Sequence, residues 1–237
     1  MFPSHDPAAA WASGGNLGTG RYSGGGFGIQ TAAAFAGGKY GSPPTLVGVA
    51  LSEEYNGTSW SEGNYLNTAR RYLSGAAGTQ TSGVVFGGFD TSPGATAATE
   101  EYDGTSWTNG GNLNSARGNL AGSGTQTAAL GAGGTGRVAV SEEYNGTSWS
   151  EVNNYPINTY AVEGAGTQTA ALMAGNFGPP YTSPPYAPNV VTEYDGTNFT
   201  VVNGMGTARY NGGMFGTQTS AIYAGGVNGS VSQSRSQ

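Results

Sequence analysis

The stretch "EEYDGTSW" at residues 100–107 is one of four near-copies in this chain. The other copies are "EEYNGTSW" at 53–60 and at 142–149, and "TEYDGTNF" at 192–199. Each copy places Asn-Gly or Asp-Gly between two runs that are typical of strands. This dipeptide favours a type I′ hairpin turn, because glycine tolerates the positive φ that the turn requires. The repeated stretch therefore predicts a β-hairpin with tyrosine and tryptophan on its two flanking strands.

Some of the same turn residues also belong to potential N-glycosylation sequences, at Asn56, Asn145 and Asn198. The equivalent positions Asp103 and Asp195 cannot be glycosylated, but aspartate forms such a turn equally well. The turn interpretation is therefore favoured over glycosylation.

A second marker of the form "GTQT" occurs five times, at intervals of 42 to 50 residues. The copies are "GIQTA" at 28–32, "GTQTS" at 78–82 and 216–220, and "GTQTA" at 124–128 and 166–170. Each copy runs into an apolar stretch that ends in two small residues, usually a pair of glycines. An arginine precedes four of the copies, while Tyr160 stands at the place where the fourth unit is expected to have it. Repeats of this length predict a solenoid or propeller of small four-stranded units.

The whole chain, residues 1–237, is expected to form one domain of five units. Their approximate bounds are 16–64, 65–111, 112–153, 154–203 and 204–237. The fifth unit ends in "VNGSVSQSRSQ", which leaves no residues for a fourth strand. The N-terminal "AAAWASGG" aligns Trp11 with the repeated tryptophans, so residues 1–15 are predicted to form a latch strand that completes the last unit and protects its edge. The structural repeat positions are Trp11, Tyr55, Trp60, Tyr102, Trp107, Tyr144, Trp149, Tyr194 and Phe199.

A four-stranded unit with a glycine pair after its second strand, Tyr on the third and Trp on the fourth resembles the kelch repeat. The resemblance implies an all-β, five-bladed β-propeller with kelch-like four-stranded blades, closed by the N-terminal strand. Two departures stand out. Kelch proteins commonly have more blades, and the fourth unit has Tyr160, Asn176 and Phe199 in place of Arg, the second Gly and Trp.

Composition and charge exclude several function classes. A net charge of −6 with only eight scattered basic residues argues against nucleic acid as a partner. No apolar run approaches the length of a transmembrane helix, so we expect no membrane insertion, and the N-terminus lacks the features of a secretory signal. The absence of cysteine removes disulfides, thiolate metal sites and cysteine nucleophiles.

The acidic pairs are the strongest candidates for chemistry, but their repetition argues for structure. Glycoside hydrolysis requires two carboxylates in unlike environments, whereas these recur at one equivalent position in each unit. We expect one glutamate of each unit to pair with the arginine of that unit. A Ser-His-Asp triad could use only His5, the one histidine of the chain, and no G-x-S-x-G motif is present to supply its serine. The chain is therefore expected not to be an enzyme and to have no catalytic residue, metal site or cofactor.

Function in repeat proteins tends to lie where the repeats differ. The link after the second strand is "KYGSPPTLVGVALS" in the first unit and "FGPPYTSPPYAPNVVT" in the fourth, and both are longer than the corresponding link in the third. Proline stiffens these loops, so Tyr40, Phe177, Tyr181 and Tyr186 are candidate interaction residues. The alternative is that the long loops only cover the blades.

The repeats "YNGTSW…LNTAR…GTQTAAL" also look like those in predicted structural proteins of marine and cyanobacterial phages. This resemblance implies a virion structural or attachment protein, as capsid decoration or as a tail or fibre component, acting as an interaction scaffold. It would be assembled in the host cytoplasm and exposed on the particle. Its partners would be other virion structural proteins or a host surface glycan or receptor, with a homo-oligomer as a further option. The alternatives are a lectin-like carbohydrate-binding propeller and an intracellular kelch adaptor.

Overall fold

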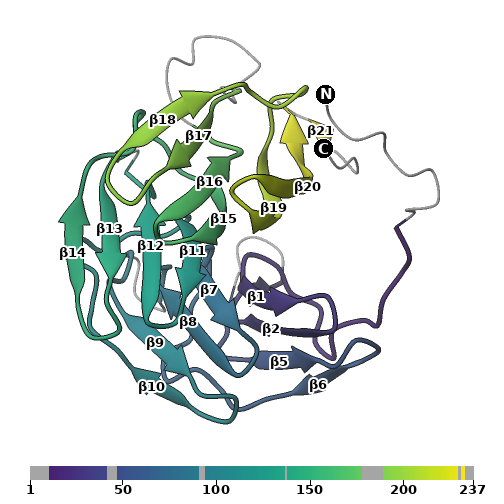
Figure 1. The fold of residues 1–237 in the computed structure, drawn as a ribbon. Coiled ribbons are helices and arrows are strands. Elements are labelled where there is room, and N and C mark those ends of the chain that lie inside the picture. Colours follow the sequence, from purple (N-terminus) through teal and green to yellow (C-terminus); the bar gives the residue numbers. More distant parts are fainter. Residues whose placement is uncertain are drawn as a thin grey trace.

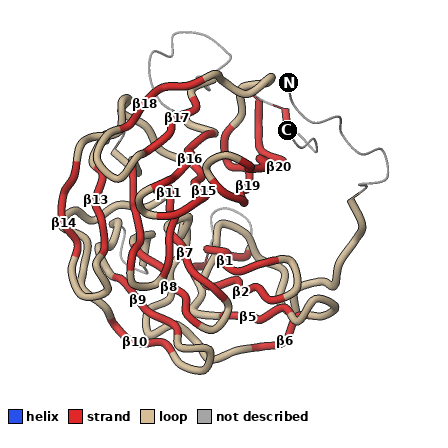
Figure 2. The backbone as a smooth tube through the Cα atoms, in the orientation of Figure 1, coloured by secondary structure: helices blue, strands red, loops and turns tan. Residues whose placement is uncertain are grey.

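A computed structural model of the chain describes residues 11–41, 47–90, 94–136, 138–177, 189–228 and 231–232. All regular structure in these residues is β-strand, as Figure 2 shows. None of the described residues belongs to a helix that is long and apolar enough to cross a membrane. The prediction of an all-β fold is confirmed.

Four antiparallel sheets of four strands each form the blades. Blade 1 consists of β1 (Gly25–Ile29), β2 (Ala32–Ala36), β5 (Ser52–Tyr55) and β6 (Trp60–Glu62). Blade 2 consists of β7 (Ala76–Thr79), β8 (Ser82–Phe86), β9 (Thr99–Tyr102) and β10 (Trp107–Asn109). Blade 3 consists of β11 (Ala121–Thr125), β12 (Ala128–Ala132), β13 (Ser141–Tyr144) and β14 (Trp149–Val152). Blade 4 consists of β15 (Glu163–Thr167), β16 (Ala170–Ala174), β17 (Val191–Tyr194) and β18 (Phe199–Val202).

Two smaller sheets complete the described structure. The C-terminal sheet contains three strands, namely β19 (Tyr210–Thr217), β20 (Ser220–Asn228) and β21 (Val231–Ser232). A two-stranded ribbon after blade 1's second strand pairs β3 (Lys39–Tyr40) with β4 (Val47–Gly48).

The sheets lie one after another around a common axis, with the first strand of each sheet innermost (Figure 1). Each inner strand contacts the inner strand of the next sheet, from β1 through β7, β11 and β15 to β19. Glycine permits this approach. A Cβ on Gly122 would lie 2.5 Å from Ala76 N, and one on Gly164 would lie 2.7 Å from Gly122 O. The small residues of the first strands therefore allow backbones of neighbouring blades to meet at the axis.

The prediction of five four-stranded blades closed by the N-terminus is wrong for the described residues. Four blades are complete, the fifth sheet has three strands, and no sheet joins it to blade 1. Residues 11–15 are not a strand, and the rest of the predicted latch, residues 1–10, lies outside the described residues. The C-terminal unit has no Glu-Glu-Tyr in its sequence, so it lacks the residues that fix a third strand elsewhere. Accordingly β21 pairs only with the last residues of β20.

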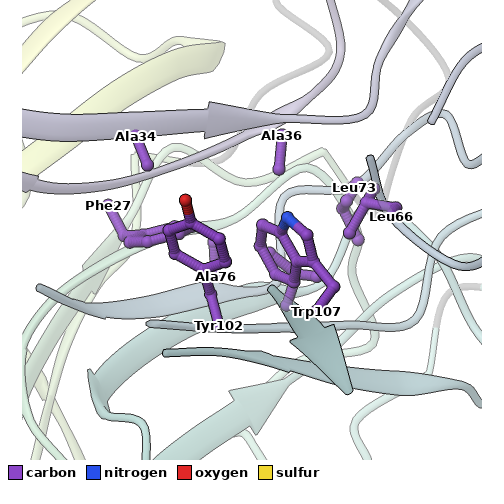
Figure 3. Packing of buried hydrophobic residues seen from close by; sticks show 9 residues of the cluster. Phe27, Ala34, Ala36, Leu66, Leu73, Ala76, Tyr102 and Trp107 are labelled. Atoms are coloured by element: carbon purple, nitrogen blue, oxygen red, sulfur yellow. The ribbon is translucent and has the colours of Figure 1, made fainter. Parts of the chain in front are cut away.

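The core consists of aromatic and aliphatic layers between consecutive blades. Figure 3 shows one such layer, in which Trp107 and Tyr102 of blade 2 face Phe27, Ala34 and Ala36 of blade 1. The rings of Trp107 and Tyr102 stack with centroids 4.7 Å apart, and Phe27 meets Trp107 edge-on at 6.1 Å. The tyrosine and tryptophan of blade 2 thus pack it against blade 1, and Tyr144 and Trp149 pack blade 3 against blade 2 in the same way.

The repeated hairpin turns differ from the predicted type I′ geometry. Tyr102 pairs directly with Trp107, so the loop has four residues, and within it only Gly104 has a positive φ, of 89°. The side chain of Asp103 explains the turn, because its Oδ1 accepts hydrogen bonds from the backbone N–H of Thr105 at 2.8 Å and of Ser106 at 2.7 Å. Asn and Asp therefore recur here as side-chain acceptors and do not need a left-handed backbone. Equivalent bonds occur at Asn56, Asn145 and Asp195.

Candidate functional site

The first glutamate of each pair forms an ion pair inside its own blade. Arg70 Nη2 lies 2.7 Å from Glu100 Oε1, and Arg117 Nη2 lies 2.8 Å from Glu142 Oε1. Arg21 and Glu53 form the same pair in blade 1. These side chains are at most 5% exposed, so the paired charges are withdrawn from water. The expected glutamate–arginine pairing is confirmed in the first three units.

The second glutamate of each pair connects neighbouring blades. Tyr102 donates its hydroxyl hydrogen bond to Glu54 at 2.5 Å, and Tyr194 donates to Glu143 at 2.9 Å. Burial, and then the bond to Glu54, raises the pKa of Tyr102. The two carboxylates of one pair thus have different partners, one within the blade and one in the next.

The glutamine of the "GTQT" turn forms a second connection between blades in four of the five copies. Gln126 Nε2 donates to the carbonyls of Gly83 at 3.2 Å and Tyr102 at 2.8 Å in the preceding blade. The same two-pronged contact recurs in three further copies, made by Gln80, Gln168 and Gln218. The repeated glutamines and the second glutamates therefore stabilise the contacts between neighbouring blades.

The fourth unit replaces the ion pair with an uncharged arrangement. Thr159, not Tyr160, occupies the arginine position: its carbonyl accepts from Gly134 N, as the carbonyl of Arg117 accepts from Gly88 N. The alignment that placed Tyr160 opposite arginine is therefore wrong by one residue. The deeper reason is that several positions change together, since Thr192 also stands where the other units have the paired glutamate.

Asn176 compensates for the missing arginine. Its Nδ2 donates to Val190 O at 2.9 Å, which is the carbonyl equivalent to Ala98 O, the acceptor of Arg70 Nη1 in blade 2. The fully buried Tyr155 fills the same region, with its hydroxyl 3.4 Å from Asn176 Nδ2. The loss of the arginine and the loss of the second glycine in the fourth unit are thus linked, because Asn176, at the glycine position, makes a hydrogen bond that the arginine makes in blade 2.

A cavity of about 960 Å³ lies at the axis, and residues from all four blades and the C-terminal sheet line it. Its wall combines rings with small polar groups, including Tyr22, Phe35, Lys39, Tyr72, Phe89, Asn119, Thr135, Tyr160, Glu163 and Asn211. Cavities of this size hold small organic ligands. We take this cavity as the candidate functional site.

Four residues with a left-handed backbone conformation line the cavity, and we call them the collar. They are Ser23, Tyr72, Asn119 and Asn211, and their φ values lie between 51° and 59°. The collar is bonded from blade to blade: Asn119 N donates to Tyr72 O at 3.0 Å, and Leu73 N donates to Ser23 O at 3.1 Å. A left-handed conformation in non-glycine residues is strained and is most common at functional sites. Here the blade-to-blade bonds hold it in place.

The residues at the rim of the cavity differ from unit to unit. The position after each glycine pair is occupied in turn by Lys39, Phe89, Thr135, Phe177 and Val227. Each lies beside the residue that follows the arginine position of its unit, in the order Tyr22, Arg71, Gly118, Tyr160 and Tyr210. The backbone pairing is therefore uniform while the side chain at this position varies, with phenylalanine in the second and fourth units. Of the five residues, Lys39, Phe89 and Thr135 line the cavity.

Glu163 is the acidic residue of the cavity wall. Part of its surface faces the cavity, but the surrounding protein desolvates its carboxyl group, and this burial raises its pKa to about 8. The carboxyl group is therefore largely protonated at neutral pH and can donate a hydrogen bond. Within the described ranges, no group of three or more His, Cys, Asp or Glu side chains is placed to hold a metal ion.

Two of the four predicted interaction residues, Tyr40 and Phe177, belong to the described residues and lie near the cavity. Tyr40 is 43% exposed and follows Lys39 directly. Phe177 is not an exposed anchor, because its ring packs between Tyr160 at 5.0 Å and Tyr210 at 4.7 Å. Tyr181 and Tyr186 lie outside the described residues.

Most of the repeat positions singled out in the sequence are buried or half-buried in the structure. Trp107 and Trp149 are buried, and Tyr102, Tyr144 and Tyr194 are at most 2% exposed. Tyr55, Trp60 and Phe199 are half-buried. Trp11 is 69% exposed and meets Phe215 of the C-terminal sheet edge-on, with centroids 6.2 Å apart.

Sequence reasoning missed the cavity residues, above all Lys39, Tyr72 and Glu163. They stand one to three residues from repeated markers, at positions that differ between units. The usable signal was that difference itself, together with the fact that Lys39 is the only lysine of the chain.

Comparison with protein-family models and with curated proteins finds no match. Among solved structures, one titled "Structure of YjhT" is similar, with a TM-score of 0.74, 12% sequence identity, and an alignment covering 92% of this chain and 81% of that chain. At this identity the likeness shows the propeller-like fold alone. A fold by itself does not select one activity.

Proposed function

We propose that the chain is a non-enzymatic binding scaffold of kelch-like repeats that serves as a structural or attachment protein of a bacteriophage particle. The observation that carries the binding role is the division of labour within each unit. Repeated residues hold the blades, whereas the rim of the central cavity differs from unit to unit. Binding surfaces of repeat proteins commonly collect such differences on one face.

The assignment to a particle rests on the resemblance of the repeats to those of phage structural proteins. Its partners would be other virion proteins or a host receptor, bound through the face that carries Lys39, Tyr40 and Phe89. The surface chemistry suits a protein exposed outside a cell, since charged residues are only 9% of the chain. A homo-oligomer is compatible with this role.

Particle composition tests the assignment. Antibodies raised against the purified protein should label intact particles released from host cells that carry the gene, and mass spectrometry should find the chain in purified particles. Its absence from purified particles, while it is present in the lysate, would contradict the structural role.

A second candidate function, carbohydrate binding, is favoured by the cavity wall. Tyrosine and phenylalanine rings stand there beside the amide and hydroxyl groups of Asn119 and Thr135. Apolar rings with a few placed polar groups are typical of ligand pockets. A separate sugar pocket in every blade is less favoured, because the repeated rings such as Tyr144 and Trp149 are buried between blades.

A glycan array tests the second candidate. The wild-type protein should bind a defined set of saccharides, and Tyr72→Ala should weaken that binding. Tyr65→Ala is a matched control, since Tyr65 is 55% exposed and does not line the cavity. Equal weakening by both substitutions would argue against a cavity site.

A further inference from the structure

Lys39 is held firmly at the wall of the cavity. It is the only lysine of the chain, it is 4% exposed, and it lines the cavity. Its backbone N–H donates to Tyr22 O at 2.8 Å, and its carbonyl accepts from Tyr22 N at 3.0 Å. The position of the side chain is thus determined by a bonded ribbon and not by a free loop.

The ammonium group of Lys39 rests against two tyrosine rings. Nζ lies 3.7 Å from the ring centroid of Tyr72 in blade 2 and 4.9 Å from that of Tyr22 in blade 1. Both distances are within the range of cation–π contacts. These ring contacts use none of the hydrogen-bond donors of the ammonium group, and Lys39 is one of the residues that line the cavity.

Lys39 differs from the buried arginines in having no carboxylate partner among the described residues. Arg21, Arg70 and Arg117 each form an ion pair with a glutamate, while no such pair includes Lys39. Lysine is almost never fully buried without a partner, because the desolvated charge is costly. A buried ammonium that faces a cavity and has donors to spare indicates a place for an anionic group.

The other charged residue of the cavity wall does not oppose an anion at neutral pH. Glu163 is largely protonated there because burial raises its pKa to about 8. Ser23, Asn119 and Thr135 add uncharged hydrogen-bonding groups. A volume of about 960 Å³ is large enough for a mono- or disaccharide.

We propose that the central cavity binds an acidic saccharide and that Lys39 holds its carboxylate or sulfate group between Tyr22 and Tyr72. This inference rests on the carbohydrate-binding function proposed above and adds the charge of the ligand. The competing interpretation is that Lys39 only clamps blade 1 to blade 2 through its two ring contacts.

Isothermal titration with matched sugars tests the inference. The probes are glucuronate, N-acetylglucosamine 6-sulfate and neutral glucose. We expect at least one acidic probe to bind roughly 10–100-fold more tightly than glucose, as for a hydrogen bond to a charged group. Lys39→Met keeps the aliphatic stem and should reduce acidic binding to the level of glucose, while Lys39→Arg should retain the preference. The two acidic probes distinguish carboxylate from sulfate recognition.

A second readout uses the wild-type protein, so it does not depend on the folding of any variant. Because the chain has one lysine, ¹³C-lysine labelling gives a single side-chain signal. Glucuronate or the sulfated sugar should shift this signal and glucose should not. A signal unmoved by both acidic probes, or an acidic preference that survives Lys39→Met, would overturn the inference. Equal binding of glucose and the acids would overturn it while leaving carbohydrate binding intact.

Discussion

The hydroxyl of Tyr144 in blade 3 donates a hydrogen bond to Glu101 of blade 2 across 2.5 Å. Glu100, the neighbour of Glu101, instead pairs with Arg70 inside blade 2. Three adjacent residues of the repeated Glu-Glu-Tyr thus have three different partners, namely their own blade, the following blade and the preceding blade. Blade 3 makes the same three contacts through Glu142, Glu143 and Tyr144, so the motif serves the two blades that have a neighbouring blade on both sides in the same way.

Removal of the Tyr144 hydroxyl should loosen one blade boundary. We expect Tyr144→Phe to lower the free energy of unfolding by about 1–3 kcal/mol, since the hydroxyl bonds to a charged group. Tyr55→Phe is the matched control and should change it by less than about 0.5 kcal/mol, because no sheet precedes blade 1 among the described residues. Urea unfolding measures both. Equal effects at the two positions would contradict the blade-to-blade role.

The same bond predicts a dependence on alkaline pH. Burial, and then the bond to Glu101, raises the pKa of Tyr144 to about 12, whereas an unfolded tyrosine ionises near about 10. The stabilisation is therefore fully present below a pH of about 10 and lost as pH rises toward about 12. Tyr144→Phe should show a shallower loss of stability over this interval in unfolding measurements.

The buried ion pair should be costly to break on one side only. Arg117→Met leaves Glu142 buried without its cation, and we expect a loss of about 3–5 kcal/mol. The double variant with Glu142→Met should lose less than the sum of the two single variants, because no buried charge remains unpaired. A double-mutant cycle in urea measures this coupling, and strict additivity would argue against a paired role.

The fourth unit predicts a coupled pair of substitutions. Trp149 Nε1 donates to Thr99 Oγ1 at 3.0 Å, whereas the equivalent Ser141 Oγ has no partner in the described structure because Phe199 has no N–H to give. Tyr155 fills space beside Phe199, with ring centroids 5.3 Å apart. Phe199→Trp alone should therefore overpack the boundary and cost about 1–3 kcal/mol.

Adding Tyr155→Leu should relieve that overpacking, since leucine stands at this position in units 2 and 3 as Leu66 and Leu113. We expect the double variant to be more stable than the sum of the single effects allows. Trp149→Phe is the reverse control and should destabilise the blade 2–blade 3 boundary by removing the bond to Thr99. Independent effects of Phe199→Trp and Tyr155→Leu would show that the two positions do not share one space.

The carboxyl group of Glu163 should make stability fall between acidic and mildly alkaline pH. Its folded pKa of about 8 lies above the unfolded value near about 4.3, so the folded chain binds the extra proton in this interval. Stability is highest, with respect to this group, below the unfolded pKa and declines until about pH 8. Glu163→Gln should reduce this decline in the free energy of unfolding by roughly 1–3 kcal/mol. The effect is smaller than the full pKa shift implies, because solvent in the cavity screens the charge. Thermal unfolding from pH 5 to 8 that is the same in both proteins would contradict this account.

Much of the fold could be predicted because the repeats carry the same contacts at the same spacing. The hairpins, the ring packing of Trp107 and Trp149, and the arginine–glutamate pairs all follow from one unit applied several times. The type I′ turn was not confirmed. Asp103 and its equivalents stabilise the turn by accepting backbone hydrogen bonds through their side chains, and they do not adopt the positive φ that a type I′ turn requires.

The irregular parts could not be predicted from the repeat. The sequence alignment placed Tyr160 at the arginine position, which Thr159 occupies in the structure. The alignment was misleading because the fourth unit differs from the others at Thr159, Asn176 and Thr192 together. The cavity could not be predicted because its residues come from different units. Lys39 of the first unit contacts the ring of Tyr72 of the second unit only because the blades meet at the axis. The expected latch strand is not formed by residues 11–15, which are the described part of the predicted latch.

Site-specific photo-cross-linking on assembled particles tests the central claim, that repeated residues build the scaffold and the varied rim binds the partner. A benzophenone side chain is placed at Tyr40, beside the cavity, or at Thr58, in an exposed repeated turn. Both positions are exposed, so either variant is expected to fold. We predict cross-links to a partner protein or receptor from position 40 and none from position 58. Cross-links from position 58 alone would contradict the account.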